Sequence, residues 1–164
     1  MDQELQKTFA SALAAREKAH APYSRFKVGD GLLLEDGNIV SGCNVENSSF
    51  GATICAERNA VCATVARFGA VKVKALVLVT EPAASPCGLC LQVLSEFCGP
   101  ELPIYQSTPR GLGKVVGGGI LGAGSLGPAG AIGGAAAGGA GVNALQKAAF
   151  EMFDPSYAAI RDQM

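Results

Sequence analysis

The sequence predicts an α/β layered domain in which a mixed β-sheet is covered by helices. Three observations support this fold class. The 164 residues suffice for one domain with a hydrophobic core. Helix-like and strand-like patterns alternate along residues 1–110. One run, residues 71–79, is β-branched and apolar with its lysines only near its start, which is typical of a buried central strand.

The first predicted element is an amphipathic helix over residues 5–16, where apolar residues recur at helical spacing and Pro22 ends the pattern. Residues 27–34 and 39–45 are apolar runs on either side of residues 35–38, which read EDGN and have strong turn propensity. This arrangement predicts a β-hairpin.

The remaining elements alternate between helix and strand. Residues 55–68 form a predicted helix that stops before Gly69, and the central strand over 71–79 follows. A second helix over residues 87–97 opens after Ser85-Pro86, and residues 102–106 form a short strand.

The glycines divide the chain into two unequal parts. Of the 22 glycines, fourteen lie between Gly111 and Gly141. We therefore expect a core over residues 1–110, an atypical glycine- and alanine-rich segment over 111–142, and a C-terminal helical tail over 143–164 in the same domain. Residues 115–146 contain no charged residue, but their small residues and Pro128 make a membrane span unfavourable, and no membrane partner is expected.

Charge and cysteine content narrow the function classes. Thirteen Lys and Arg against fourteen Asp and Glu give a net charge of −1, which disfavours a nucleic-acid polymer as partner and favours a small substrate. Six cysteines follow a polar N-terminus, MDQELQKTFA, without a secretory signal. We expect a cytoplasmic protein with reduced thiols available to a metal.

Three cysteines lie at the predicted starts of two helices, where the helix dipole favours thiolates. Cys55 begins one helix, and Cys87 and Cys90 form a Cys-x-x-Cys pair at the other. Three sulfurs are one short of a closed structural zinc site, so the pattern predicts catalytic zinc with an open position for water. Glu57 is placed to carry the proton of that water as general acid and base.

Two alternatives concern the other thiols. Cys87 and Cys90 could form a redox dithiol, or Cys43, Cys62 or Cys98 could supply a fourth sulfur to a closed zinc knot. A closed knot would leave Glu57 unexplained, so we interpret the three remaining cysteines as small buried hydrophobic residues.

Four ordered motifs carry a resemblance to a known family: FKVG at residues 26–29, GCNVEN at 42–47, TICAERNA at 53–60, and the helix from Cys87 to Phe97. Across residues 5–106 the sequence resembles the cytidine deaminase family of free-nucleoside enzymes with three cysteine ligands. The resemblance implies a three-layer sandwich and one Zn²⁺ per subunit. It also implies deamination of cytidine and 2′-deoxycytidine to uridine and 2′-deoxyuridine through zinc-bound hydroxide, in pyrimidine salvage, by a homotetramer.

The resemblance also implies roles for individual residues. Asn44 and Glu46 would hold the ribose, Phe26 would pack near the pyrimidine, and the backbone at Ala56 and Ser85-Pro86 would recognise the base edge. Arg58 would offset the negative charge of the three thiolates. Phe150 is the candidate aromatic residue for a neighbouring subunit's site.

Three positions depart from the family's pattern. Asp30 stands where a small alanine is usual, Phe50 where tyrosine is frequent, and Leu91 where arginine is common. Two alternatives therefore remain open: a deaminase of another aminated nucleoside or base analogue, and a catalytically silent zinc-binding module of the same fold.

Overall fold

The computed structural model describes residues 3–99 and 101–115. Its helices and strands confirm the expected order of the core. They are α1 (Gln3–Glu17), β1 (Gly29–Leu34), β2 (Ile39–Cys43), the 3-10 helix η1 (Phe50–Ala52), α2 (Ala56–Phe68), β3 (Val73–Val79), α3 (Gly88–Leu94), β4 (Ile104–Thr108) and β5 (Gly111–Val115).

The strands form one five-stranded mixed sheet in the order β2-β1-β3-β4-β5. Strand β1 pairs antiparallel with β2 and β3, β3 pairs parallel with β4, and β5 pairs antiparallel with β4. The central position of β3 confirms the prediction for that segment, and all but Lys74 in this strand are buried. The expected hairpin is present as β1 and β2.

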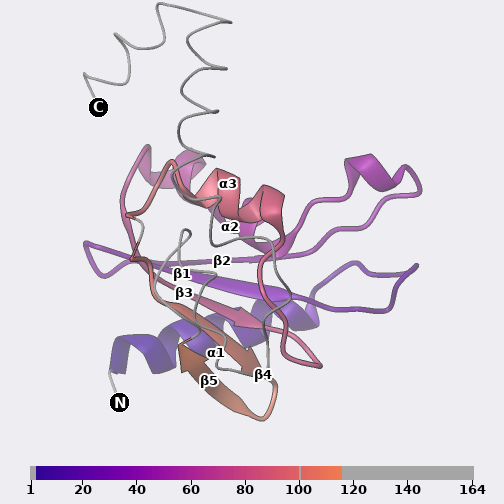
Figure 1. The fold of residues 1–164 in the computed structure, drawn as a ribbon, viewed down its shortest axis with the longest axis horizontal. Helices are drawn as coiled ribbons and strands as arrows, with labels where there is room; N and C mark the ends of the chain where they lie inside the picture. The colour runs from indigo at the N-terminus through magenta and orange to yellow at the C-terminus, as the bar shows by residue number, and fades with distance from the viewer. Residues whose placement is uncertain (1–2, 100, 116–164) are drawn as a thin grey trace, which may run out of the picture.

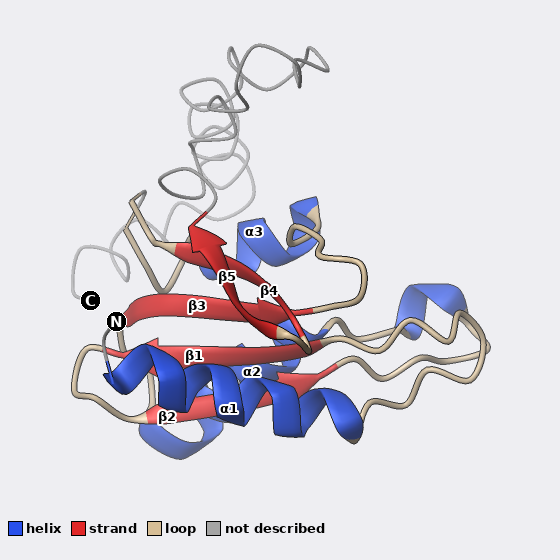
Figure 2. Cartoon of the chain, turned by 90° about the horizontal axis from the view of Figure 1, so that it is seen from below, coloured by secondary structure: helices blue, strands red, loops and turns tan. Residues whose placement is uncertain are grey.

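The sheet separates two helical layers. Helix α1 covers one face, and α2 and α3 cover the other (Figure 1, Figure 2). The larger apolar cluster lies on the α2 and α3 face and includes Leu32, Leu76 and Leu94. The smaller cluster lies on the α1 face, where Ala12 meets Val77 and Val79. The three-layer α/β architecture is thereby confirmed.

Glycines let both layers approach the sheet closely. A Cβ at Gly29 would collide with the backbone of α1 at Ala12 and Arg16, and a Cβ at Gly42 would collide with the backbone of α2 at Ala56 and Ala60. These contacts fix the distance between each helix and the strand beneath it. They also fix the start of α2, which carries part of the site described below.

Several elements differ from the sequence prediction. The 3-10 helix η1 was not predicted, and β4 (Ile104–Thr108) begins and ends two residues later than the strand predicted over 102–106. Helix α3 ends at Leu94 rather than 97, because the last residues tighten into three-residue turns in which Phe97 N–H donates to the Leu94 carbonyl at 2.9 Å. Strand β5 was not predicted, and it uses the first five residues of the glycine-rich segment. The rest of that segment, the C-terminal tail and Phe150 lie outside the described residues.

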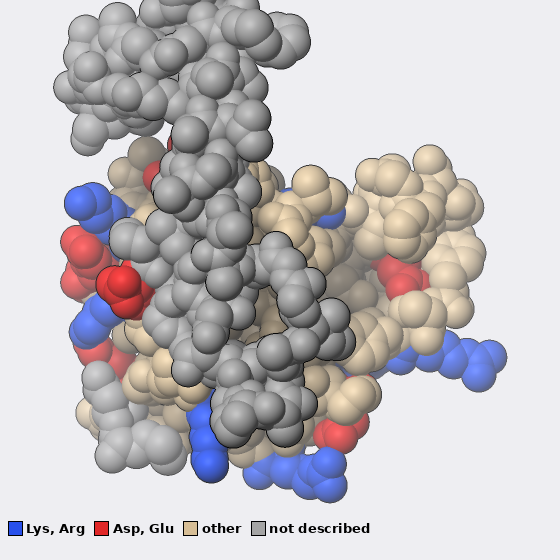
Figure 3. Space-filling model, in the orientation of Figure 1, with Lys and Arg blue, Asp and Glu red and all other residues tan. Residues whose placement is uncertain are grey.

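The distribution of charged side chains on the surface agrees with the near-zero net charge of the sequence. On the face drawn in Figure 3, acidic and basic side chains are interspersed rather than separated by sign.

None of the helices in residues 3–99 and 101–115 combines the length and apolar character needed to cross a membrane.

Candidate metal centre and adjoining pocket

The beginnings of α2 and α3 bring three cysteine sulfurs together. Cys55 is the N-cap residue of α2, Cys87 is the N-cap residue of α3, and Cys90 lies in the first turn of α3. Their Sγ atoms all lie within 4.8 Å of one another, with 4.0 Å between Cys55 and Cys87 and 3.4 Å between Cys87 and Cys90. The predicted ligand set is therefore assembled in space.

The spacing of the sulfurs fits a zinc ion. Two Zn–S bonds of about 2.3 Å at a tetrahedral angle place their sulfurs about 3.8 Å apart. Both close sulfur pairs lie within a few tenths of an ångström of that separation. Cys55, Cys87 and Cys90 form a zinc site, and three protein ligands leave a fourth position free for a water or a substrate.

Arg58 lies beside this sulfur cluster as expected. Its guanidinium donates to the Cys55 sulfur at 3.6 Å and to the Thr53 carbonyl at 3.0 Å. The sulfur contact and the nearby thiols raise the pKa of Arg58, so its positive charge is secure next to the thiolates. This charge opposes the net negative charge that three thiolates give to Zn²⁺.

The surroundings of the two thiols at the start of α3 shift their pKa values in opposite directions. Burial opposes ionisation of Cys87, but hydrogen bonds from the backbone and thiol of Cys90 outweigh it and lower the pKa of Cys87. Burial and the nearby Glu57 carboxylate raise the pKa of Cys90. The helix start therefore favours a thiolate at Cys87, whereas Cys90 depends on a metal to displace its proton.

Glu57 lies in the first turn of α2, two residues after Cys55, and only 4% of its surface is exposed. Burial raises the pKa of its carboxyl, although its backbone N–H, Cys90 and Arg58 act in the opposite direction. A carboxyl that gains a proton readily while remaining beside the sulfur cluster suits general acid and base chemistry.

A cavity of about 310 Å³ opens beside the sulfur cluster. This volume is at the lower end of the range for small-molecule sites. The candidate site residues in its lining come from four parts of the chain: Phe26, Asn44, Glu46, Cys55, Ala56, Glu57, Ser85 and Cys87.

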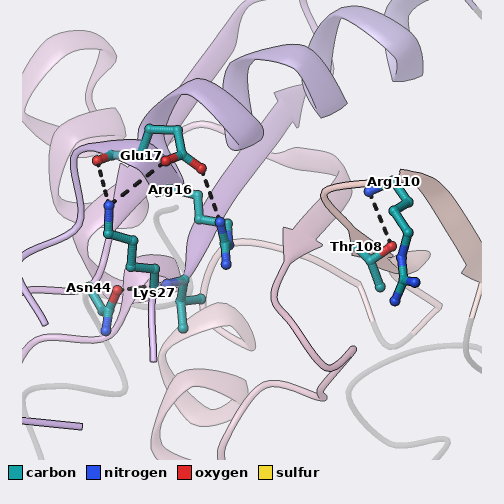
Figure 4. A network of polar contacts seen from close by, with 7 residues as sticks. Arg16, Glu17, Lys27, Asn44, Thr108 and Arg110 are labelled. Atoms are coloured by element: carbon teal, nitrogen blue, oxygen red, sulfur yellow. Dashed lines mark hydrogen bonds and ion pairs between the residues drawn. The ribbon is translucent and has the colours of Figure 1, made fainter. Parts of the chain in front are cut away.

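Asn44 lines this cavity and holds the segment that carries Phe26 through two hydrogen bonds. Its Oδ1 accepts the Val28 N–H at 2.8 Å, and its Nδ2 donates to the Phe26 carbonyl at 2.9 Å. Lys27 lies in the same segment, and its ammonium donates to the Glu17 carbonyl at 3.1 Å, which ties the segment to the end of α1 (Figure 4). The placement of Phe26 therefore depends on Asn44.

Glu46 holds the turn that precedes this segment. Its carboxylate accepts the Tyr23 N–H at 2.8 Å, the Ser24 N–H at 3.2 Å and the Ser24 hydroxyl. These hydrogen bonds lower the pKa of Glu46 and keep it ionised, and the bond from the Ser24 hydroxyl has the largest effect. An ionised carboxylate at the rim of the cavity is a strong acceptor for ligand hydroxyls.

The prediction for the remaining cysteines was partly wrong. None of Cys43, Cys62 and Cys98 is among the described residues that could hold a metal, which agrees with the expectation that they are not ligands. They are not fully buried, however: Cys62 is exposed because it occupies the outward side of α2, and Cys43 and Cys98 are half-buried.

Sequence reasoning missed several residues that line the cavity. Ser24, Thr53, Leu78, Thr80 and Ala84 contribute to its wall, and Ser24 also bonds to Glu46. These residues lie at strand ends and in connections, where no residue-type pattern distinguishes them. Two of them carried a signal: Thr53 is the first residue of the TICAERNA motif, and Ser24 lies two residues before Phe26.

Comparison with known proteins agrees with this geometry. Residues 2–106 match the family described as cytidine and deoxycytidylate deaminase zinc-binding region. The cytidine deaminase of Sporosarcina psychrophila is 46% identical over 110 residues, which cover 66% of this chain and 80% of that protein.

Two solved structures are also similar. The crystal structure of cytidine deaminase from Mycobacterium leprae has a TM-score of 0.60 at 38% identity and covers 70% of this chain and 94% of that one. The corresponding structure from Mycobacterium tuberculosis has a TM-score of 0.59 at 41% identity and covers 69% and 91%. With its three-sulfur zinc site and buried Glu57, the chain belongs to the cytidine deaminase family.

Proposed function

We propose that this protein catalyses the hydrolytic deamination of cytidine and 2′-deoxycytidine to uridine and 2′-deoxyuridine. One water is consumed, a C–O bond forms at C4 of the base, the C4–N bond breaks, and ammonia leaves. The observation that carries the proposal is the buried Glu57 carboxyl beside the three-sulfur zinc site, in a cavity of about 310 Å³.

Glu57 performs the proton transfers of this reaction. Zinc, when bound at Cys55, Cys87 and Cys90, supplies the Lewis acidity that makes water a nucleophile at neutral pH. Glu57 takes one proton from the attacking water and delivers it to N3 of the base, and then carries the second proton of that water, from the oxygen now bonded to C4, to the departing amino group. Its burial supports this role, because a raised pKa lets the carboxyl hold the proton between transfers.

The cavity wall binds the nucleoside from two sides. Phe26 offers an apolar ring to the pyrimidine, and the backbone at Ala56 and Ser85 faces the base edge. The ionised Glu46 and the amide of Asn44 accept and orient the ribose hydroxyls. Both residues already use hydrogen bonds within the chain, so sugar binding adds to contacts that hold the cavity in shape.

The proposal includes a homotetramer and a cytoplasmic location. Phe50 is 91% exposed and Ile54 is 44% exposed, and Phe50 also lines the cavity. An exposed aromatic residue at the cavity rim supports burial against another subunit. The cysteines of the described residues are free thiols, which supports a reducing compartment. Sedimentation that finds only fully active monomers would contradict the tetramer.

The decisive test measures zinc content and turnover together. The zinc-loaded protein is mixed with cytidine or 2′-deoxycytidine, and loss of the substrate's ultraviolet absorbance is followed. Glu57→Gln keeps the size of the side chain but cannot carry the proton, so we expect retained zinc and a rate lower by about 100- to 10,000-fold. A zinc-loaded wild-type protein that leaves both nucleosides unchanged would disprove the proposal, and turnover of another aminated nucleoside in the same assay would redirect it.

A further inference from the structure

The connection between β3 and α3, residues 80–87, links the sheet to the metal site. It ends at Cys87, a zinc ligand, and its residues Thr80, Ala84 and Ser85 line the cavity. A small shift of this connection would therefore move a cavity wall and a ligand together.

Three contacts fasten this connection to the β4–β5 hairpin. Thr80 N–H donates to the Ser107 carbonyl at 3.1 Å, and the Arg110 guanidinium contacts the Glu81 carboxylate at 2.9 Å. The Gln106 side-chain amide donates to the Ser85 hydroxyl. The first two contacts hold the beginning of the connection, whereas the third holds Ser85, two residues before Cys87.

The position of Gln106 follows from the register of the sheet. Parallel pairing of β3 and β4 places Gln106 beside Leu78, and Leu78 lines the cavity. Neighbouring residues in register share a face of the sheet, so Gln106 is on the α2 and α3 face.

Strand β5 restrains Gln106 from the other side. Gln106 pairs with Lys114 in the antiparallel ladder, which is irregular between Gln106 and Thr108. A Cβ at Gly113 would collide with the Gln106 carbonyl group, so β5 approaches this residue closely only because position 113 is glycine. The backbone of Gln106 is thus fixed on both sides while its side chain reaches the connection.

We propose that Gln106 is a positioning residue for the deaminase site, acting through Ser85. Gln106 is not in the cavity lining, so it reaches the substrate only through the residue it holds. Its amide occupies one acceptor position of the Ser85 hydroxyl and leaves the hydroxyl proton of Ser85 available to an acceptor elsewhere. Without the amide, Ser85 and its backbone lose their fixed orientation toward the base.

The test is a double-mutant cycle with Gln106→Leu and Ser85→Ala, and it rests on the proposed deamination of cytidine. We expect each single change to lower kcat/KM by about 3- to 10-fold, mainly through a higher KM, because one neutral hydrogen bond is lost in each. The double variant should be no worse than the poorer single variant, because both changes remove the same contact. Zinc content should remain that of the wild type in all three.

Two further variants separate positioning from general loss of structure. Gln106→Glu places a carboxylate that accepts the Ser85 hydroxyl proton, so it should recover most of the lost kcat/KM. Arg110→Ala removes a contact of an exposed side chain at the far end of the connection, and its kcat/KM should match that of the wild type. If Gln106→Leu does not fold, Gln106→Met takes its place in the cycle.

The outcomes distinguish this inference from the proposed function. If wild-type protein does not deaminate cytidine, the proposed function fails and the cycle is not reached. If wild-type protein is active but the two changes are additive, or Gln106→Leu matches wild-type kinetics, Gln106 has no positioning role and the inference is overturned.

Discussion

The same strands form both faces of the sheet, but the two faces differ in the residues they present and in their role. On the α1 face, small residues pack tightly: Gly29 and Gly31 lie against the helix, and Ala12 fills the space between them and β3. The α2 and α3 face contains the larger apolar cluster, the zinc ligands and Glu57. Successive strand residues point to opposite faces of the sheet. Substitutions at neighbouring positions of β1 therefore affect different faces: one the α1 face, the next the α2 and α3 face that carries the metal site.

The largest expected effect is on the chemical face. Cys87→Ala removes one of three ligands, so we expect loss of bound zinc and a decrease in cytidine turnover of more than about 100-fold. Zinc stoichiometry and initial rates measure the two losses. Cys62→Ala is the matched control, because Cys62 is exposed and lies outside the sulfur cluster. If Cys87→Ala kept both zinc and activity, Cys87 would have to be removed from the ligand set.

The next prediction compares the two faces directly through Gly29→Ala and Gly42→Ala. Each adds a methyl group that collides with helix backbone, so each should lower the free energy of unfolding by about 1–3 kcal/mol. Only Gly42→Ala should reduce activity per folded molecule, because its methyl group displaces the first turn of α2 and with it Glu57.

Chemical denaturation measures the stability difference, and rates are divided by the folded, zinc-loaded fraction. Gly99→Ala is the control, since a Cβ there meets no atom within 4 Å. Equal loss of specific activity in Gly29→Ala and Gly42→Ala would remove the distinction between the faces.

An effect of opposite sign, on stability alone, is expected at Asp30, which lies in β1 between Gly42 and Leu78. Its side chain is fully buried on the α2 and α3 face, and among the described residues neither carboxyl oxygen has a hydrogen-bond partner. Burial, together with the charge of Glu57, raises the pKa of Asp30 well above 3.8. Asp30→Ala should therefore stabilise the protein by about 1–3 kcal/mol at pH 7.

The pH dependence of this gain follows from linkage. Because the folded-state pKa of Asp30 is raised, the native protein binds more protons than the unfolded chain above about pH 3.8, and its stability falls as pH rises toward the raised pKa. The advantage of Asp30→Ala should accordingly be largest at neutral pH and vanish near pH 3–4. Unfolding at several pH values measures it. Asp36→Ala, at an exposed carboxyl with a lowered pKa, should show no such gain.

The smallest effect on the free energy of unfolding is expected at Lys27, an exposed side chain near the end of α1. Lys27→Ala removes the contact between Lys27 and the end of α1 at Glu17, drawn in Figure 4. Both side chains are exposed, so the change in unfolding free energy should be within about 0.5 kcal/mol. Asn44→Ala, in the same network but buried, should cost about 1–3 kcal/mol and raise the KM for cytidine. Similar effects of the two would show that burial does not govern this network.

The sequence predicted the chemical face better than the structural details around it. Cys55, Cys87 and Cys90 follow a spacing that favours metal binding at two helix starts, and the structure brings their sulfurs together. The end of α3 was less predictable, because the turns after Leu94 continue an apolar helical pattern with different hydrogen bonds.

Strand β5 was missed because glycine at 111 and 113 weakens any strand pattern, although Gly113 is what permits its pairing. The burial of Asp30 was also not predicted, since the sequence places Asp30 in a strand but does not indicate which face of the sheet its carboxyl occupies. The burial of Asp30 depends on pairing with the distant strand β3, and the pairing of β5 depends on the close approach of Gly113 to Gln106; residue-type patterns indicate neither contact.

The N-cap residues of α2 and α3 also affect the conformational freedom of the unfolded chain. Neither Cys55 nor Cys87 caps its helix through a side-chain hydrogen bond, so their sulfurs remain available to join two points 32 residues apart. An ion held by both would restrict the unfolded chain in the manner of a disulfide, removing loop entropy that the reduced thiols alone leave in place. The catalytic centre would then also act as a reversible cross-link, broken by chelation rather than by reduction.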